Sequence, residues 1–204
     1  MTKTNYHHGN LREALLVSAH CILVAEGVGG LSLRKVAKQT GVSATALYSH
    51  FKDKRELLAV LASEGYEQLA ASMLAAAGAT GTTDNRDSGL RLSGLALGYV
   101  SFATENDALF QLMFGREIGN LTDYPFLVES GSRCYALMAQ SVAVKLRDSG
   151  SLDSPAVAAT AAWSMVHGLA TLINDGRITP GTCGVSSNEE MVLQLCRTFT
   201  FGYQ

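Results

Sequence analysis

Two short helix-forming stretches around a turn, at residues 32–51, constrain this chain more than any other feature. Ser32 and Ser43 stand where an N-cap would begin each helix, and Gly41 stands in the turn between them. The pattern predicts a helix-turn-helix, and the alternative is a helical hairpin with no role at DNA. Apolar residues at helical spacing could bury one side of this pair against a preceding helix: Leu33, Val36, Ala37, Val42, Leu47 and Phe51.

The rest of the chain also has the periodicity of helices. It contains only three prolines in 204 residues, and strand-like alternation of apolar and polar residues is scarce. We predict an all-α fold, with an N-terminal three-helix domain at residues 1–53 and a C-terminal helical domain at residues 54–204. The long helix that opens the second domain is expected from Asp53 to about Ala77. The other helices of that domain are expected at 89–105, 107–115, 124–148, 155–175 and 188–202, after a loop at 78–88.

The charge of the chain is unevenly distributed. Residues 1–55 contain eight basic and three acidic residues, a formal charge of +5, whereas the remaining residues contain eight basic and fifteen acidic residues, a charge of −7. The total of −2 therefore hides a basic N-terminal region, which favours a polyanionic partner for that region alone.

Several function classes lack their sequence signals. The chain has no GxSxG, Walker A, HExxH or paired-carboxylate pattern, so an enzyme or carrier is the weaker alternative. The four cysteines have no CxxC spacing and the five histidines have no placed partners, so we expect no metal and no cofactor. The polar N-terminus has no apolar leader, and we expect a cytoplasmic protein with no membrane partner.

Residues 10–58 resemble the N-terminal domain of the TetR family of bacterial transcriptional regulators. The most specific stretch runs from Gly41-Val-Ser through Leu47-Tyr-Ser-His-Phe-Lys-Asp to Lys54. The resemblance implies an all-helical C-terminal domain that binds a small effector and dimerises through its last two helices. It also implies that the second short helix enters the major groove of DNA.

The resemblance assigns roles to particular residues at the DNA. Tyr48 and His50 are expected to contact phosphates, and Lys54 is expected to bind another phosphate. Ala44 and Thr45 are expected to face base edges, where they could meet thymine methyl groups. Three further residues complete the expected contacts, two basic side chains near the backbone and one helix N-terminus aimed at a phosphate: Arg34, Lys35 and Ser43.

Aromatic and methionine side chains in the acidic C-terminal domain could line an apolar effector pocket. Trp163, His167 and Gly168 resemble a Trp-His-Gly signature found in one branch of the family, and Trp163 and His167 share a helix face. The alternative for this pair is ordinary packing. The expected effector site comprises eight residues: Phe102, Phe110, Met113, Phe114, Tyr135, Met138, Trp163 and His167.

The last two expected helices each carry an apolar face with small residues that would let helices approach closely. Two such helices from each subunit would make a four-helix bundle in a homodimer, and intrachain packing of the same face is the alternative. The expected dimer residues are Val157, Ala161, Gly168, Leu172, Val192, Leu195 and Phe199.

Together these observations predict a ligand-responsive DNA-binding regulator. We expect a repressor that is released from a palindromic DNA operator by a small, largely apolar effector. The alternatives are a regulator of the same architecture without an effector, and a transcriptional activator.

Overall fold

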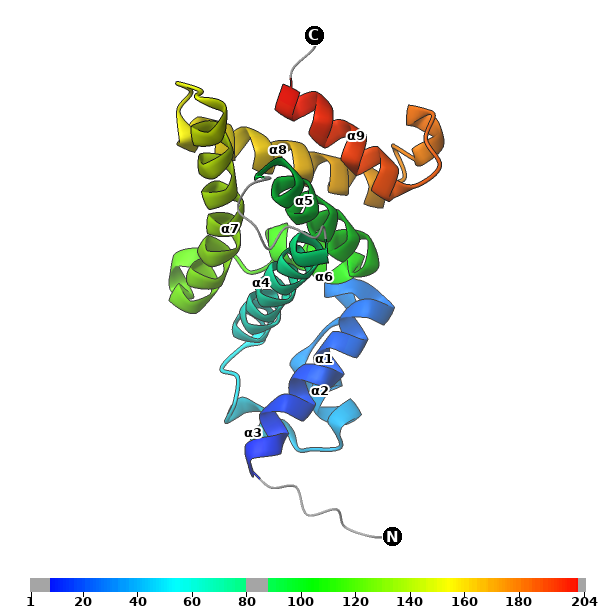
Figure 1. Ribbon diagram of the computed structural model, residues 1–204. Helices are drawn as coiled ribbons and strands as arrows, with labels where there is room; N and C mark the ends of the chain where they lie inside the picture. Colours follow the sequence, from blue (N-terminus) through cyan, green and yellow to red (C-terminus); the bar gives the residue numbers. More distant parts are fainter. Residues whose placement is uncertain (1–7, 80–87, 202–204) are drawn as a thin grey trace. The chain divides into compact units, whose positions relative to one another are not determined.

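The computed structural model describes residues 8–79 and 88–201, with side chains from residue 11 to 79 and from 88 to 199. Within these residues the chain is helical and has no strand, which confirms the predicted all-α fold (Figure 1). Two 3-10 turns interrupt the helices, at Leu121–Asp123 and Pro180–Cys183. The α-helices are α1 (His8–Gly30), α2 (Leu33–Thr40), α3 (Ala44–Tyr48), α4 (Lys54–Ala79), α5 (Ser88–Glu105), α6 (Asp107–Phe114), α7 (Pro125–Ser149), α8 (Pro155–Asn174) and α9 (Asn188–Phe201).

The chain divides into two compact units that differ from the predicted domains. The first unit comprises residues 1–65 and 108–128, and the second comprises residues 66–107 and 129–204. Helices α4 and α7 each pass from one unit into the other. The predicted functional boundary at residue 53 concerns DNA and effector binding, and it stays a prediction.

The caps of the helix-turn-helix form as the sequence predicts. Ser32 and Ser43 accept hydrogen bonds from the backbone N–H groups of Lys35 (3.3 Å) and Ala46 (3.1 Å), which begins α2 and α3. Gly41 ends α2 in a left-handed conformation (φ 75°), which glycine adopts at little cost. These contacts fix the direction of α3 relative to α2.

A glycine such as Gly27 can end a helix, but α1 continues past it. Gly27 has φ 69° and ψ −178°, so the helix kinks there and continues to Gly30. Asn10 lies inside this helix, which begins at His8. The loop expected at 78–88 falls mainly on residues 80–87, outside the described residues.

In the second unit, α5 crosses α4 with the two backbones in close contact. A Cβ atom at Gly94 would lie 2.6 Å from the Ala77 Cα, and one at Gly98 would lie 2.6 Å from the Met73 Cα. The Ser72 hydroxyl also donates to the Gly98 carbonyl across this crossing (2.9 Å). Helix α5 packs in addition against α8 and α9, so it is the central helix of this unit.

Helix α8 is the one described helix that is long and apolar enough to cross a membrane by length and composition alone. Core helices of globular proteins meet the same criterion, and α8 packs against α5. Its apolar composition is therefore accounted for in part by packing within the second unit.

Candidate DNA-binding surface and effector site

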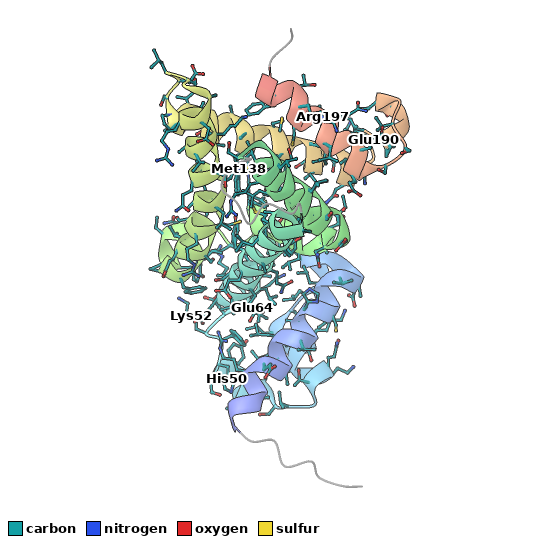
Figure 2. All side chains as sticks on the ribbon, viewed as in Figure 1. His50, Lys52, Glu64, Met138, Glu190 and Arg197 are labelled. Carbon is teal, nitrogen blue, oxygen red and sulfur yellow. The ribbon has the colours of Figure 1, made fainter. Side chains whose placement is uncertain are left out.

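Helix α3 buries one side and exposes the other. Leu47 is fully buried, whereas Ser43, Ala44 and Thr45 are exposed and the Tyr48 side chain is 54% exposed. The residues expected to face base edges and one expected phosphate ligand thus share the outer surface of α3. His50 follows this helix and is half-buried (Figure 2).

The buried side of the helix-turn-helix explains how so short a helix is held. Helix α3 has five residues, too few to be stable in isolation. It is anchored by Leu47 and by Phe51, which is 1% exposed. Helix α2 contributes the buried side chains predicted from the sequence, Leu33, Val36 and Ala37, and only Val42 of the predicted set is half-buried rather than buried.

The basic residues assigned to DNA differ in their surroundings. Arg34 is exposed on α2. Lys35 pairs with Glu26 at the surface, where an ion pair contributes little stability. The Lys54 ammonium, by contrast, donates a hydrogen bond to the Val28 carbonyl (2.8 Å) near the end of α1. Its expected role at a phosphate stays a prediction.

The sequence pattern did not single out Arg12 for this surface. The Arg12 guanidinium lies over the Phe51 ring, 5.4 Å from its centroid, and Arg12 is exposed on α1. It therefore adds a positive charge beside the residue that anchors α3. The signal was present in the count of basic residues, but its position depends on how α1 crosses the helix-turn-helix.

Two of the expected effector residues, Trp163 and His167, contact Tyr99, which the sequence pattern did not indicate, and a third, Tyr135, contacts Trp163. Tyr99 is fully buried on α5, and its hydroxyl lies 2.9 Å from His167 Nδ1. The Trp163 ring meets Tyr99 edge to face (5.3 Å between centroids) and also meets Tyr135 (5.5 Å). Trp163, Tyr135 and His167 are half-buried, so the pair on one face of α8 contacts both α5 and α7.

Burial controls the ionisation of this aromatic cluster, defined as Tyr99, Tyr135, Trp163 and His167. Desolvation lowers the pKa of His167 and raises the pKa of Tyr99, so both are neutral near pH 7. A neutral tyrosine hydroxyl can donate to His167 Nδ1 or accept from it, so the direction of this bond depends on the tautomer of His167. The bond joins two neutral groups near neutral pH.

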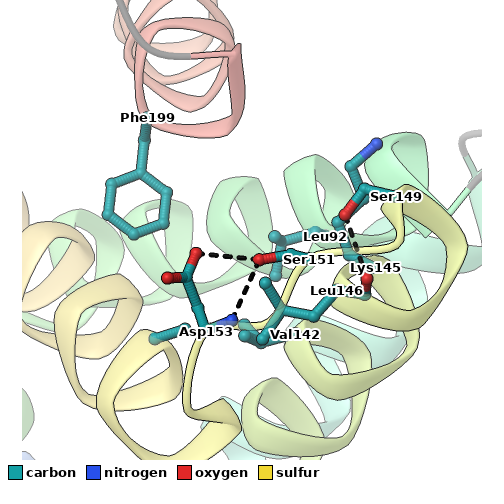
Figure 3. Close-up of a pocket in the computed structure, with 9 residues that line it drawn as sticks. Leu92, Val142, Lys145, Leu146, Ser149, Ser151, Asp153 and Phe199 are labelled. Atoms are coloured by element: carbon teal, nitrogen blue, oxygen red, sulfur yellow. Dashed lines mark hydrogen bonds between the residues drawn. The ribbon is translucent and has the colours of Figure 1, made fainter.

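Four of the other five expected effector residues are more deeply buried than Tyr135, Trp163 and His167. Phe102 and Met138 in the second unit, and Phe110 and Met113 in the first, are each at most 4% exposed. Phe114 is half-buried in the first unit, and its ring is tilted by 52° to that of Phe110, with 4.9 Å between the centroids. A hollow of about 350 Å³ opens elsewhere in the second unit (Figure 3), and none of the eight expected residues lines it.

Two family models match the chain. The model described as "Tetracyclin repressor-like, C-terminal domain" matches residues 92–198, which is more than half of the chain. The model of "Bacterial regulatory proteins, tetR family" matches residues 15–61. The chain belongs to the TetR family of transcriptional regulators. The resemblance predicted from the helix-turn-helix is confirmed, and this TetR-family protein is a regulator rather than an enzyme, as predicted.

One curated relative matches the helix-turn-helix region. Tetracycline repressor protein class C from Escherichia coli is 47% identical over 51 residues, which are 25% of this chain and 23% of that protein. The TetR-family chain thus covers about a quarter of the length of this relative.

Solved structures match over nearly the whole length. A protein of unknown function from Rhodococcus sp. RHA1 is 33% identical with a TM-score of 0.82, covering 98% of both chains. The TetR family transcriptional regulator PfmR from Thermus thermophilus is 18% identical with a TM-score of 0.68, covering 100% of this chain and 99% of its own. The transcriptional regulator FadR from Bacillus subtilis, in complex with stearoyl-CoA, is 14% identical with a TM-score of 0.70, covering 94% and 99%. The last two show the fold alone.

The residues expected at a TetR-family dimer face are mostly, but not all, on the surface of the subunit. Val157 is 69% exposed, Phe199 is 40% exposed and Leu172 is 37% exposed. Ala161 is exposed, Leu195 is half-buried, and a Cβ atom added at Gly168 would have nothing within 4 Å. Val192 is only 2% exposed, so packing within this subunit already covers it.

Proposed function

We propose that this TetR-family chain is a ligand-responsive repressor that binds a palindromic DNA operator as a homodimer in the cytoplasm. The observation that carries the proposal is the outer face of α3, where Ala44, Thr45 and Tyr48 are exposed on a helix anchored by Leu47. A helix presented in this way fits the major groove. Two copies are needed because one short helix reads too few bases to define an operator.

The DNA-binding part is tested by selecting duplexes from a random library and then measuring affinity by fluorescence anisotropy. Tyr48→Phe should weaken binding about equally for all duplexes, because a phosphate contact carries no sequence information. Thr45→Ala should instead change the preferred base at one position of each half-site, by about 1–3 kcal/mol. Thr122→Ala, at an exposed threonine outside the helix-turn-helix, is the matched control and should change neither.

Salt dependence separates DNA binding from the helical-hairpin alternative. A protein that neutralises phosphates loses affinity steeply as the salt concentration rises. If affinity for any duplex is weak and independent of salt, α3 does not bind DNA and the proposal is wrong.

The dimer is supported by the exposed apolar positions of α8 and α9. Val157→Asp would place a charge on this face, so the dimer should dissociate in analytical ultracentrifugation. Leu152→Asp is the control, because Leu152 is fully exposed in the loop before α8 and lies outside the expected interface. A Val157→Asp chain that stays dimeric would place the interface elsewhere.

We propose that the effector meets the aromatic cluster of Tyr99, Tyr135, Trp163 and His167. Trp163 is the only tryptophan of the chain, so a ligand at the cluster reports directly through its fluorescence. Stearoyl-CoA is a suitable first probe, since FadR from Bacillus subtilis was solved with that ligand. The expected result is a saturable change in Trp163 fluorescence together with release of the operator, with a coupling of about 1–3 kcal/mol. A reporter gene behind the operator then distinguishes repression from activation.

One observation favours the second candidate, a TetR-family DNA-binding regulator without an effector. Phe102 and Met138 in the second unit, and Phe110 and Met113 in the first, are buried by neighbouring side chains, which leaves little of their surface open to a ligand. If no apolar ligand changes Trp163 fluorescence or operator affinity at saturation, this second function holds.

A further inference from the structure

Arg12 is a basic side chain of the first unit to which the family resemblance assigns no role. It is exposed in the second turn of α1, a helix that begins at His8. Its guanidinium carbon lies 5.4 Å from the centroid of the Phe51 ring, which is within reach of a cation–π contact. Phe51 lies just after α3, and its N–H donates to the Leu47 carbonyl (3.1 Å). The Arg12 charge is therefore held beside the C-terminal end of α3, the helix proposed to read DNA.

This position puts a charge near the residues that are expected to contact phosphates. The start of α1 lies beside the end of α3 in the first unit (Figure 1). Tyr48 and His50, two of the expected phosphate contacts, precede Phe51 by three residues or fewer. In helix-turn-helix proteins, the elements next to the recognition helix cross the phosphate backbone. A duplex bound by α3 would therefore bring phosphates to the start of α1.

The charge of Arg12 is not neutralised by a carboxylate within the described part of the chain. No ion pair to Arg12 forms among those residues. Three of the four carboxylates in residues 1–56 are bound by other groups: Glu26, Asp53 and Glu56. The fourth, Glu13, is adjacent to Arg12 on α1, and adjacent side chains of a helix do not face each other. Residues 1–10 contain no Asp or Glu.

A guanidinium above an aromatic ring is well suited to bind a phosphate. The attraction to the ring face is electrostatic and needs no hydrogen bond, so the five N–H donors stay available for other groups. These donors form a rigid, planar fork that matches two oxygens of a phosphate. The ring also restricts the side chain, so less conformational entropy is lost when the phosphate binds.

We propose that Arg12 binds a phosphate of the DNA backbone and that the Phe51 ring positions its guanidinium for this contact. The proposal rests on the proposed DNA-binding function and adds to it a contact from α1, outside the helix-turn-helix itself. Because a phosphate contact carries no sequence information, Arg12 contributes to the affinity for every duplex and leaves the choice of operator to α3.

The experiment measures binding of the full chain by fluorescence anisotropy at several salt concentrations. One duplex is selected from the random library, and the other is an unrelated duplex of the same length. Arg12→Gln should weaken binding to both about fivefold at low salt and reduce the steepness of log affinity against log salt by about 0.9. Arg12→Lys keeps the charge and should keep the steepness of the natural chain. Arg116→Gln, at an exposed arginine of the first unit outside the helix-turn-helix, is the matched control and should change neither quantity.

Unfolding in urea without DNA separates a phosphate contact from a merely structural one. If Arg12 only supports Phe51, Arg12→Gln should lower the urea midpoint and leave the salt dependence unchanged. We expect the opposite, a midpoint close to that of Arg116→Gln and a reduced salt dependence.

The positioning role of Phe51 is tested with Phe51→Leu, which keeps an apolar anchor and removes the ring. Thermal unfolding checks that this variant is folded. In that background Arg12→Gln should cost less affinity than in the natural chain, and an equal cost would overturn the role of the ring. Salt-dependent binding by the natural chain with the same steepness in Arg12→Gln would overturn the phosphate contact while leaving the DNA-binding function intact. Salt-independent, weak binding by the natural chain itself would overturn both.

Discussion

Lys54 gives the sharpest test of how structure and DNA binding are connected, because the family resemblance and the structure assign it different partners. The resemblance implies a phosphate, whereas the structure places its ammonium 2.8 Å from the Val28 carbonyl. Lys54→Met keeps the apolar stem and removes the charge. If the contact to Val28 anchors the start of α4, the variant should lose stability even without DNA.

The magnitude follows from the surroundings of the contact. A hydrogen bond to a charged group contributes about 1.5–3 kcal/mol when buried. Lys54 is only half-buried, and the Val28 carbonyl also accepts a bond from the Leu31 N–H (3.3 Å), so it keeps one donor after the substitution. We therefore expect the free energy of unfolding to fall by about 1 kcal/mol in urea titrations. Lys38→Met, at an exposed lysine of α2, should leave it nearly unchanged.

The DNA readout separates the two roles of Lys54. A direct phosphate contact would lower the slope of log affinity against log salt by about 0.9 in the Lys54→Met variant. An anchoring role alone would weaken binding with no change in slope. Unchanged stability in Lys54→Met, measured beside Lys38→Met, would refute the anchoring argument.

Three further predictions follow from packing and ionisation. Gly98→Ala should destabilise the chain by about 1–3 kcal/mol in chemical unfolding, although alanine favours helices, because the new Cβ would lie 2.6 Å from the Met73 Cα; equal or higher stability would contradict the close crossing. Because burial lowers the pKa of His167 in the folded chain, the unfolded chain takes up a proton at a higher pH than the folded chain does. The free energy of unfolding should therefore fall as the pH drops below about 6.5. This fall should be smaller in a His167→Phe variant measured alongside. Leu47→Ala should cost about 2–5 kcal/mol and abolish operator binding, whereas a stable variant that still binds DNA would show that α3 does not depend on this anchor.

Local signals in the sequence were sufficient for the helices and for the helix-turn-helix. Ser32, Ser43 and Gly41 act through neighbours three or four positions away, so their caps and turn could be predicted and are confirmed. The end of α1 was harder to predict, because Gly27 allows either a stop or a kink, and in the structure the helix kinks there and continues to Gly30.

The contacts that position the site depend on long-range packing. The bond from Tyr99 to His167 joins residues 68 positions apart, and nothing near Tyr99 in the sequence marks it. Val192 has the same spacing as the exposed residues of α9, but neighbouring elements cover it in the folded subunit. The partner of Lys54 lies 26 residues away, so no periodic pattern could have indicated it.

The division of α3 into one buried anchor and an exposed outer face has an evolutionary consequence. Leu47 supports the fold, while Ala44, Thr45 and Ser49 are exposed. If the outer face of α3 reads DNA as proposed, substitutions at those three positions would change the preferred DNA sequence while most of the folding free energy is kept. A duplicated copy of this gene could therefore acquire a new operator by a few surface changes, and the rest of the chain would need no compensating mutation.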